Sequence, residues 1–286
     1  MAVTQLDDLP EDCLAHVITF TTPHYACQSV LVSAMFRRSI ESDIVWEKFL
    51  PRDYRDIVSK LVSPIEFSST RDLFFKLSAP LLIDGGTKTF AIDKITNKKC
   101  YMLSARELSI AWTSFPLYWC WKRLLQSRFA EGVELIMFCR LEIYGKVNTR
   151  ILSSDTTYGA YLVIKFADRT FGLDSLLSEI SIEVGNYKSR RKTYLSYNKR
   201  MKQEFGRVFN PRHKIDKPRS RLRSKVCEVE ECFLHERKDG WLEVELGEFY
   251  CDCTDREVIM SLEEEVKGEH LKGGLIVEGI ELRPKY

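Results

Sequence analysis

The spacing of apolar residues changes near Pro80, and this change divides the chain into two kinds of structure. Before Pro80, apolar residues recur three or four positions apart, which predicts short helices. After Pro80 they alternate with more polar neighbours, and such alternation indicates strands with one buried face. At 286 residues, the chain exceeds the usual size of one domain. We therefore expect two unequal units, a small helical one and a large β one.

The spacing of apolar residues in residues 1–51 predicts a small set of short helices. Pro10 suits a first helical turn, and Pro51 stops the last helix. A unit of this size buries little apolar surface and usually needs a partner surface to be stable. Residues 52–80 predict two further weak helices, one around Ile57 and one after Thr70. We interpret residues 52–80 as a helical connector.

Residues 81–286 predict an antiparallel β-sandwich or barrel. Alternating segments lie around Phe90 and Ile92 and along residues 108–112, 133–143, 158–166, 179–184, 241–246, 258–262 and 275–282. Asp239-Gly240 predicts a hairpin turn, because both residues tolerate the backbone angles that such a turn needs. We expect strands on either side of this turn to pair.

A basic insertion is predicted at residues 186–225. This segment holds 15 Lys or Arg and two acids, a net charge of +13, while the rest of the chain has 28 bases and 39 acids, a net charge of −11. Three interpretations stay open for it: a solvated loop, a nuclear-import signal and a contact to nucleic acid. Nucleic-acid binding is disfavoured, because short basic clusters are unspecific. The import candidates are Lys188, Arg190, Arg191 and Lys192, and residues 219–225 form a second basic run.

The sequence favours an intracellular address. No apolar run reaches 18 residues and no Lys or Arg precedes Arg37, so neither a membrane span nor a secretory leader is predicted. The nine cysteines are an odd number without the spacing of a disulfide framework. Free thiols of this kind suit the reducing cytoplasm and nucleus.

Metal and catalytic chemistry have little support. Five residues invite a zinc site: Cys227, Cys232, His235, Cys251 and Cys253. Their spacing is poor, because structural zinc sites usually pair ligands two to four residues apart. The histidines accompany no nucleophile motif, and no phosphate-binding loop is present. We expect no catalytic residue, metal or cofactor.

The N-terminal segment resembles an F-box. The resemblance rests on Leu9-Pro10-Glu11 at the start, Val32-Ser33 in the middle and Val45-Trp46 near the end. In that family, three helices dock on a Skp-type adaptor, which links them to a cullin-RING ubiquitin ligase. The resemblance implies a docking face formed by Leu9, Pro10, Ile18, Val30 and Trp46. The alternative is that these residues only form a helical cap on the second unit.

Residues 81–286 resemble the plant phloem protein 2 or Nictaba-like lectin family. Five blocks carry this resemblance in order, at residues 104–112, 118–121, 141–147, 239–249 and 272–284. The family implies a jelly-roll-like sandwich that binds N-acetylglucosamine oligomers and N-glycan cores. Together with the F-box, the resemblance covers nearly the whole chain and points to a plant F-box protein with a phloem-lectin domain.

The physics of sugar binding suggests four candidate contacts. A pyranose has an apolar C–H face and a polar rim, so a site needs an aromatic platform and acceptors for hydroxyl groups. Trp112 and Trp119 match the two binding tryptophans of the family, with core packing as the open alternative for each. Glu243 and Glu245 share one face of a predicted strand and are candidate acceptors. Residues 113–117 are more apolar than in sugar-binding relatives, which suggests recognition of a protein surface instead.

We therefore expect a mostly β chain, a jelly-roll-like antiparallel β-sandwich with a small all-α F-box. The predicted function is that of a non-catalytic substrate receptor of an SCF-type ubiquitin ligase in the cytoplasm and nucleus. It would recruit protein or glycoprotein targets for proteasomal degradation. The alternative is a soluble nucleocytoplasmic lectin that acts without ubiquitin transfer.

Overall fold

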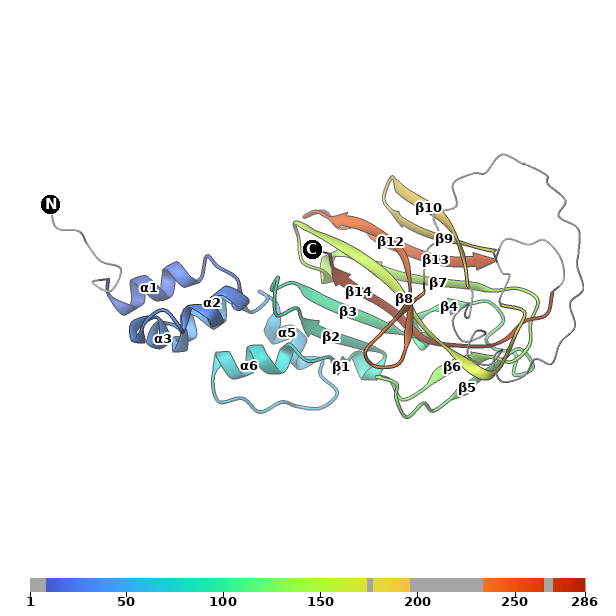
Figure 1. Cartoon of the computed structure of the whole chain (residues 1–286), viewed down its shortest axis with the longest axis horizontal. Coiled ribbons are helices and arrows are strands. Elements are labelled where there is room, and N and C mark those ends of the chain that lie inside the picture. Colours follow the sequence, from blue (N-terminus) through green and yellow to red (C-terminus); the bar gives the residue numbers. More distant parts are fainter. Residues whose placement is uncertain (1–8, 174–176, 196–233, 265–269, 286) are drawn as a thin grey trace, which may run out of the picture.

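The structure is a computed structural model that describes residues 9–173, 177–195, 234–264 and 270–285. Helices lie at one end of an elongated molecule and strands at the other (Figure 1). The helices are α1 (Glu11–Ile18), α2 (Pro23–Ser29), α3 (Ala34–Glu41), α4 (Asp43–Phe49), α5 (Tyr54–Ser59) and α6 (Thr70–Leu77). Within the described ranges, no helix is long and apolar enough to cross a membrane.

Capping side chains fix where several helices begin. Thr22, Ser33 and Ser69 precede α2, α3 and α6, and each accepts a hydrogen bond from an N–H group three residues later. This contact satisfies one of the free donors at a helix start. Residues 52–80 hold α5 and α6, the two helices expected there.

The strands form two antiparallel sheets, with short 3₁₀ turns at Asp84–Gly86, Ala105–Glu107 and Thr149–Ile151. The nine-stranded sheet contains β1 (Leu81–Ile83), β2 (Lys88–Ile92), β3 (Lys99–Ser104), β5 (Trp119–Lys122), β6 (Gly132–Leu135), β8 (Thr156–Phe171), β11 (His235–Glu236), β12 (Leu242–Cys251) and β14 (Gly273–Pro284). The five-stranded sheet contains β4 (Ser109–Ile110), β7 (Glu142–Asn148), β9 (Leu177–Val184), β10 (Tyr187–Tyr194) and β13 (Glu257–Glu264). The prediction of a mostly β chain with antiparallel pairing is confirmed, and the strands within the described ranges do not close into a barrel.

The last strand, β14, lies inside the nine-stranded sheet. It pairs with β8 on one side and with both β3 and β6 on the other. Gly279 allows the close approach to β3, because a Cβ atom there would lie 1.9 Å from the carbonyl oxygen of Leu103. The hairpin predicted at Asp239-Gly240 is confirmed by the pairing of β11 with β12.

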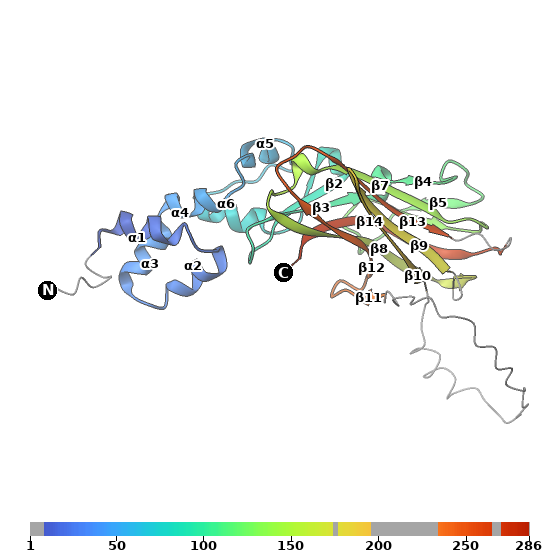
Figure 2. The same ribbon diagram turned by 90° about the horizontal axis from the view of Figure 1, so that it is seen from above.

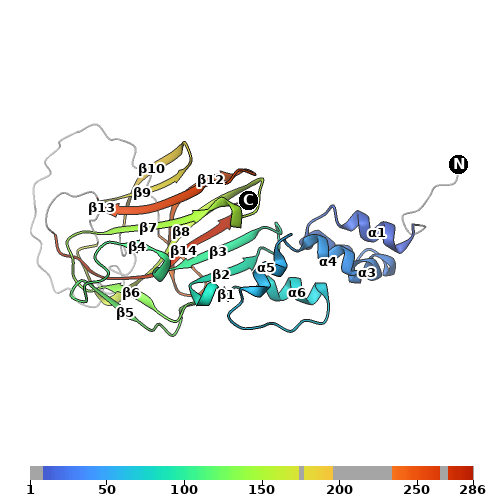
Figure 3. The same ribbon diagram turned by 180° about the vertical axis from the view of Figure 1, so that it is seen from behind.

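The two sheets are seen from above in Figure 2. Buried side chains from both sheets belong to one hydrophobic core. Gly247 on β12 illustrates how close the sheets come, because a Cβ atom there would lie 2.6 Å from Cγ2 of Ile182 on β9. The same core continues through Phe90 on β2 into Trp46 and Phe74 of the helices. Figure 3 shows α5 and α6 beside β1, β2 and β3.

Polar contacts add to this junction between helices and sheet. The Lys99 ammonium on β3 lies 2.7 Å from the carboxylate of Asp53, just before α5. Leu61 forms an isolated antiparallel bridge with Ile83 on β1. The connector is therefore tied to the sheet by its backbone as well as by its side chains.

Two expectations from the alternating pattern are wrong. The single strand expected over residues 133–143 is two strands, β6 and β7, which belong to different sheets. Ile136 and Met137 between them are exposed, because the chain crosses there from one sheet to the other. The predicted basic insertion also begins as regular structure, since residues 187–194 form β10 and pair with β9. Residues 196–225 of that insertion lie outside the described residues.

We predict that Phe74→Ala lowers the free energy of unfolding by about 3–5 kcal/mol, as for other buried Phe side chains. Phe74 is fully buried, and its ring centroid lies 5.2 Å from that of Trp46. Phe75→Ala is the matched control, because Phe75 has the same centroid distance to Trp46 but is 39% exposed. Urea unfolding measures both changes. Equal losses for the two variants would contradict the continuous core.

Candidate functional site

The structure places the five predicted adaptor contacts at different depths. Ile18 and Trp46 are buried. Leu9 and Val30 are half-buried, and Pro10 is exposed. The indole Nε1 of Trp46 donates a hydrogen bond of 2.6 Å to the carbonyl oxygen of Ile40. Trp46 therefore holds α3 and α4 together in this conformation, and its ring is not available to a partner.

Other apolar side chains of the helical unit face solvent. We define the helical docking surface as the exposed residues Val17, Phe20, Tyr25, Leu31, Val32 and Ile44. Leu31 is 86% exposed and Phe20 is 77% exposed. Most of these residues lie at helix ends or just beyond them, so the helical period that identifies the core does not identify them. These side chains leave the small helical unit with exposed apolar surface that a protein partner could bury.

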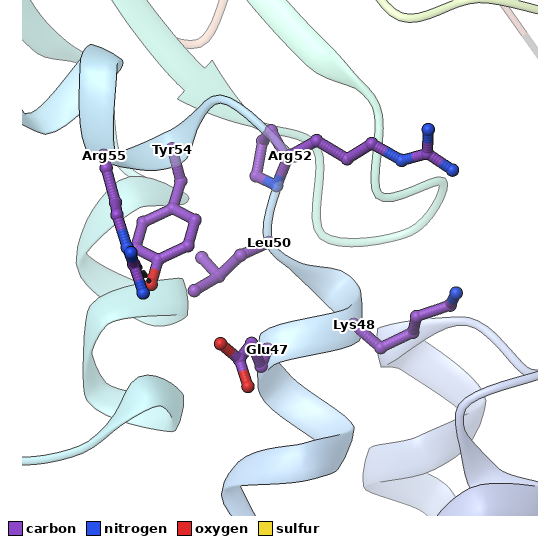
Figure 4. Close-up of a pocket in the computed structure, with 7 residues that line it drawn as sticks. Glu47, Lys48, Leu50, Arg52, Tyr54 and Arg55 are labelled. Atoms are coloured by element: carbon purple, nitrogen blue, oxygen red, sulfur yellow. Dashed lines mark hydrogen bonds between the residues drawn. The ribbon is translucent and has the colours of Figure 1, made fainter.

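A cleft of about 520 Å³ lies where α4 meets α5, lined by Glu47, Lys48, Leu50, Pro51, Arg52, Tyr54 and Arg55. Figure 4 shows Arg55 beside Tyr54, where its Nε donates a hydrogen bond of 3.2 Å to the phenol oxygen. Lys48 and Arg52 extend away from this pair. The charged groups do not converge on one point, so the cleft offers no preorganised binding site.

The two candidate tryptophans occupy opposite environments at the end of the sheets. Trp119, the first residue of β5, is 2% exposed and faces the shared core. Trp112, in the loop between β4 and β5, is 50% exposed and has a φ of 66°. Positive φ is rare for a bulky residue, and such strain clusters at functional sites.

Trp112 belongs to a group of aromatic rings from two loops. Its ring centroid lies 5.4 Å from that of Phe115 and 6.0 Å from that of Phe138, and the centroids of Phe138 and Tyr118 are 4.4 Å apart. The N–H of Ile136 donates to the carbonyl oxygen of Tyr118 at 2.8 Å, which joins the loops. We define the aromatic surface as Trp112, Phe115, Leu117, Tyr118, Ile136, Met137 and Phe138. Residues 136–138 were missed in the sequence because they lie within the long strand expected there.

The candidate carboxylates do not lie beside the tryptophans. The order of the nine-stranded sheet places β8, β14 and β6 between β12, which carries Glu243 and Glu245, and β5, which carries Trp119. Four strand spacings correspond to about 19 Å. Glu243 is bound by Arg283 at 2.6 Å and by Arg237 at 2.7 Å, and Glu245 is bound by Lys285 at 2.9 Å. Both carboxylates do share one face of β12, as expected.

These ion pairs form a charged network on the outer face of the sheet, centred on Glu281. Arg237 lies 2.5 Å and Arg128 2.8 Å from the Glu281 carboxylate. Burial alone would raise the pKa of Glu281, but the hydrogen bonds and charges of the two arginines outweigh it and lower the pKa to about 2.

Neighbouring Glu278 shows the opposite behaviour. It is fully buried, and its Oε1 accepts hydrogen bonds from the Arg128 N–H at 2.7 Å and the Ser127 hydroxyl at 3.0 Å. Its Oε2 has no hydrogen-bond partner among the described residues. Burial raises the pKa of Glu278 despite these donors.

The import candidates lie on β10, where the sheet pairs several of them with acids. Lys188 pairs with Glu183 on β9, and Arg190 lies 3.3 Å from Glu179 on the same strand. Arg191 faces Glu245 on β12 at 3.5 Å. Lys192 is exposed, and the second basic run at residues 219–225 lies outside the described residues.

The zinc candidates are only partly visible. Cys227 and Cys232 lie outside the described residues. Cys251 is buried, while Cys253 is exposed. In the described part of the chain, no group of three or more His, Cys, Asp or Glu side chains is arranged to hold a metal ion.

Comparisons with known proteins bear on both units. Residues 98–284 match the family model described as Phloem protein 2. The F-box protein PP2-B15 of Arabidopsis thaliana is 46% identical, and the alignment covers 97% of this chain and 96% of that protein. The F-box protein VBF of the same plant is 42% identical over 97% of this chain and 99% of that protein. The F-box protein PP2-B13 of Arabidopsis thaliana is 40% identical, and the alignment covers 96% of this chain and 98% of that protein.

We predict that Glu281→Gln and Glu278→Gln change stability with opposite pH dependence. The pKa of Glu281 is lowered in the folded state, so its contribution is complete above the unfolded-state pKa near 4.5 and is lost as the pH falls toward about 2. Glu281→Gln should cost about 3 kcal/mol at pH 7 and much less near pH 2.

The pKa of Glu278 is raised, so the wild-type protein loses stability as the pH rises from the unfolded-state pKa through the folded-state pKa. Glu278→Gln should therefore stabilise most at neutral pH, and its gain should shrink below pH 4. Urea unfolding across this pH range measures both variants. Parallel pH profiles would show that the two carboxylates do not occupy these different environments.

Proposed function

Because the chain belongs to the plant family of F-box proteins with a phloem protein 2 domain, we propose that it is the substrate receptor of an SCF-type ubiquitin ligase. In this proposal, the helical docking surface binds a Skp-type adaptor, and the adaptor connects the chain to a cullin-RING ligase. The observation that carries the proposal is a small helical unit with exposed apolar residues, in a chain similar to named F-box proteins over nearly its full length. Burial of such side chains is what an adaptor would supply.

The receptor needs no catalytic residue of its own. It holds a target close to a ubiquitin-transferring enzyme bound elsewhere in the complex, which raises the effective concentration of the target. The shared core between helices and sheets supports this role, because it fixes the target-binding part relative to the adaptor-binding part. The proposed outcome for the target is degradation by the proteasome.

We assign target recognition to the aromatic surface. Its exposed rings, with Trp112 at 50% and Phe115 at 47%, offer flat apolar contact area of the kind that dominates binding interfaces. A target could present either an apolar peptide segment or the C–H face of a sugar to these rings. The half-exposed Trp112 favours a second candidate function, that of a nucleocytoplasmic lectin for N-acetylglucosamine oligomers or N-glycans.

Two further parts of the proposal follow from the family. The antiparallel sheets would correspond to a jelly-roll-like lectin domain, and the protein would act in the cytoplasm and nucleus. Nuclear import through β10 would require partners to compete with the ion pairs of Lys188 and Arg190.

We predict that the double variant Leu31→Glu, Val32→Glu loses co-precipitation of a Skp-type adaptor by at least about 30-fold. Both side chains are exposed, so folding should be little changed, while two charges would be placed in an apolar interface. Leu125→Glu is the control, because Leu125 is fully exposed on the β unit. Pull-down with purified adaptor measures the effect. Adaptor binding by the double variant at wild-type strength would refute the proposed docking surface.

We predict that Trp112→Ala weakens binding to chitin oligomers by about 10-fold to 100-fold if the domain recognises sugar, because stacking on the ring would be lost. Tyr250→Ala is the matched control, since Tyr250 is an aromatic residue 59% exposed on β12. A glycan array with the adaptor-bound protein provides the measurement. No glycan signal from the wild-type protein would exclude the lectin function and leave protein targets.

A further inference from the structure

The strained backbone at Trp112 needs a physical support. Four non-glycine residues in the described part of the chain have positive φ: Asp84, Asn97, Trp112 and Asp155. Asp and Asn tolerate this region because their short side chains bond the local backbone, but an indole gains no such compensation. The conformation of Trp112 therefore persists only if the surrounding structure holds both of its peptide groups.

The backbone before Trp112 is held at two successive peptide groups, one on each side of Ala111. The N–H of Ala111 donates to the carbonyl oxygen of Glu142 on β7 at 3.1 Å. The carbonyl oxygen of Ala111 accepts a hydrogen bond of 3.0 Å from the indole Nε1 of Trp119. Trp119 is only 2% exposed, so this donor is fixed by the core around it.

The peptide group after Trp112 is held through both its carbonyl oxygen and its N–H. Its carbonyl oxygen, that of Trp112, accepts a hydrogen bond of 3.1 Å from the N–H of Phe115, and its N–H, that of Thr113, donates to the carbonyl oxygen of Ile110 at 3.4 Å. The φ and ψ angles of Trp112 together set the orientation of these two peptide groups, so anchoring both groups restricts the φ of Trp112, which is 66°. The indole of Trp112 is then half-exposed against Phe115 and Phe138.

We propose that Trp119 is a positioning residue that holds Trp112 in its exposed, positive-φ conformation through the hydrogen bond to Ala111. The two tryptophans thus have different roles, although the family resemblance treats them alike. Trp112 presents its ring at the aromatic surface, and Trp119 acts only through the backbone that carries Trp112. The inference rests on the proposed function for the use of this surface, but its geometry is tested in the free protein.

The protein offers a matched control for Trp119. Trp241 is 1% exposed, and its Nε1 also donates a hydrogen bond of 3.0 Å to a backbone carbonyl, that of Gln126. Trp241 packs in a separate cluster on the outer face of the nine-stranded sheet. Trp119→Phe and Trp241→Phe therefore remove the same kind of bond from equally buried sites, and only the first bond leads to Trp112.

The experiment uses the preference for glycine over alanine at position 112 as a reporter of φ. Glycine accepts positive φ at little cost, whereas alanine does not. With Trp119 intact, we expect the melting temperature of Trp112→Gly to exceed that of Trp112→Ala by about 2–4 °C. The difference should fall below about 1 °C in the Trp119→Phe background and persist in the Trp241→Phe background. Persistence in the Trp119→Phe background would overturn the proposal.

A second measurement reads the position of the ring directly. The protein has five tryptophans, and the indole N–H resonance of Trp112 is assigned by its loss in Trp112→Gly. This resonance should shift and broaden in Trp119→Phe and stay in place in Trp241→Phe. If Trp119→Phe does not fold, benzothienylalanine at position 119 keeps the shape of the ring and removes only its N–H. An unchanged Trp112 resonance in that protein would overturn the proposal.

None of these readouts needs an adaptor, a glycan or a target. Failure of adaptor or glycan binding would therefore count against the proposed function alone. Loss of the Trp112 conformation on removal of the Trp119 bond supports the positioning role whichever target the surface binds.

Discussion

The central position of β14 is the constraint on which the β structure depends. This strand pairs with β8 along one side and joins β3 and β6 on the other, while Gly279 lets it approach the backbone of Leu103. One face of β14 supplies Leu275 and Ile280 to the shared core, and the other supplies Glu281 to the charged network. Because β14 pairs with β3, β6 and β8, which lie far before it in the sequence, the sheet forms through contacts of large sequence separation, which favours slow folding.

The shared core also decides how the helices and the sheets act together. Trp46 and Phe74 belong to the same buried cluster as Phe90 on β2, and Asp53 pairs with Lys99 on β3. A flexible linker would let the two units move independently, whereas a continuous core holds them in one orientation. Figures 1 and 3 show β4 and β5, which flank the loop of the aromatic surface, on the side away from α1–α4. The two proposed binding surfaces are therefore held apart by the body of the domain.

Sequence pattern predicted which residues share a face but not which strands are neighbours. Alternation placed Glu243 and Glu245 on one face of a strand, and the structure agrees. It could not show that three strands separate them from Trp119, because strand order is set by pairing across the whole chain. The same pattern led us to expect one strand where β6 and β7 are separate strands. The alternation of apolar and polar residues continues through residues 136–141, where the chain crosses from one sheet to the other. The exposed Leu31 was missed because periodicity detects buried positions, and the residues proposed to dock on an adaptor are exposed.

Residues that identify a motif need not be the residues that touch a partner. Three buried tryptophans, Trp46, Trp119 and Trp241, each donate an indole hydrogen bond to a backbone carbonyl and so fix a neighbouring segment. A buried indole fills a large volume and also satisfies a polar group that would otherwise be costly to bury. Trp46 lies on α4, which also carries the exposed Ile44, and the backbone that Trp119 holds leads directly to the exposed Trp112. Loss of binding on replacing a buried tryptophan would therefore report the loss of a support, and contact itself has to be tested at the exposed neighbours.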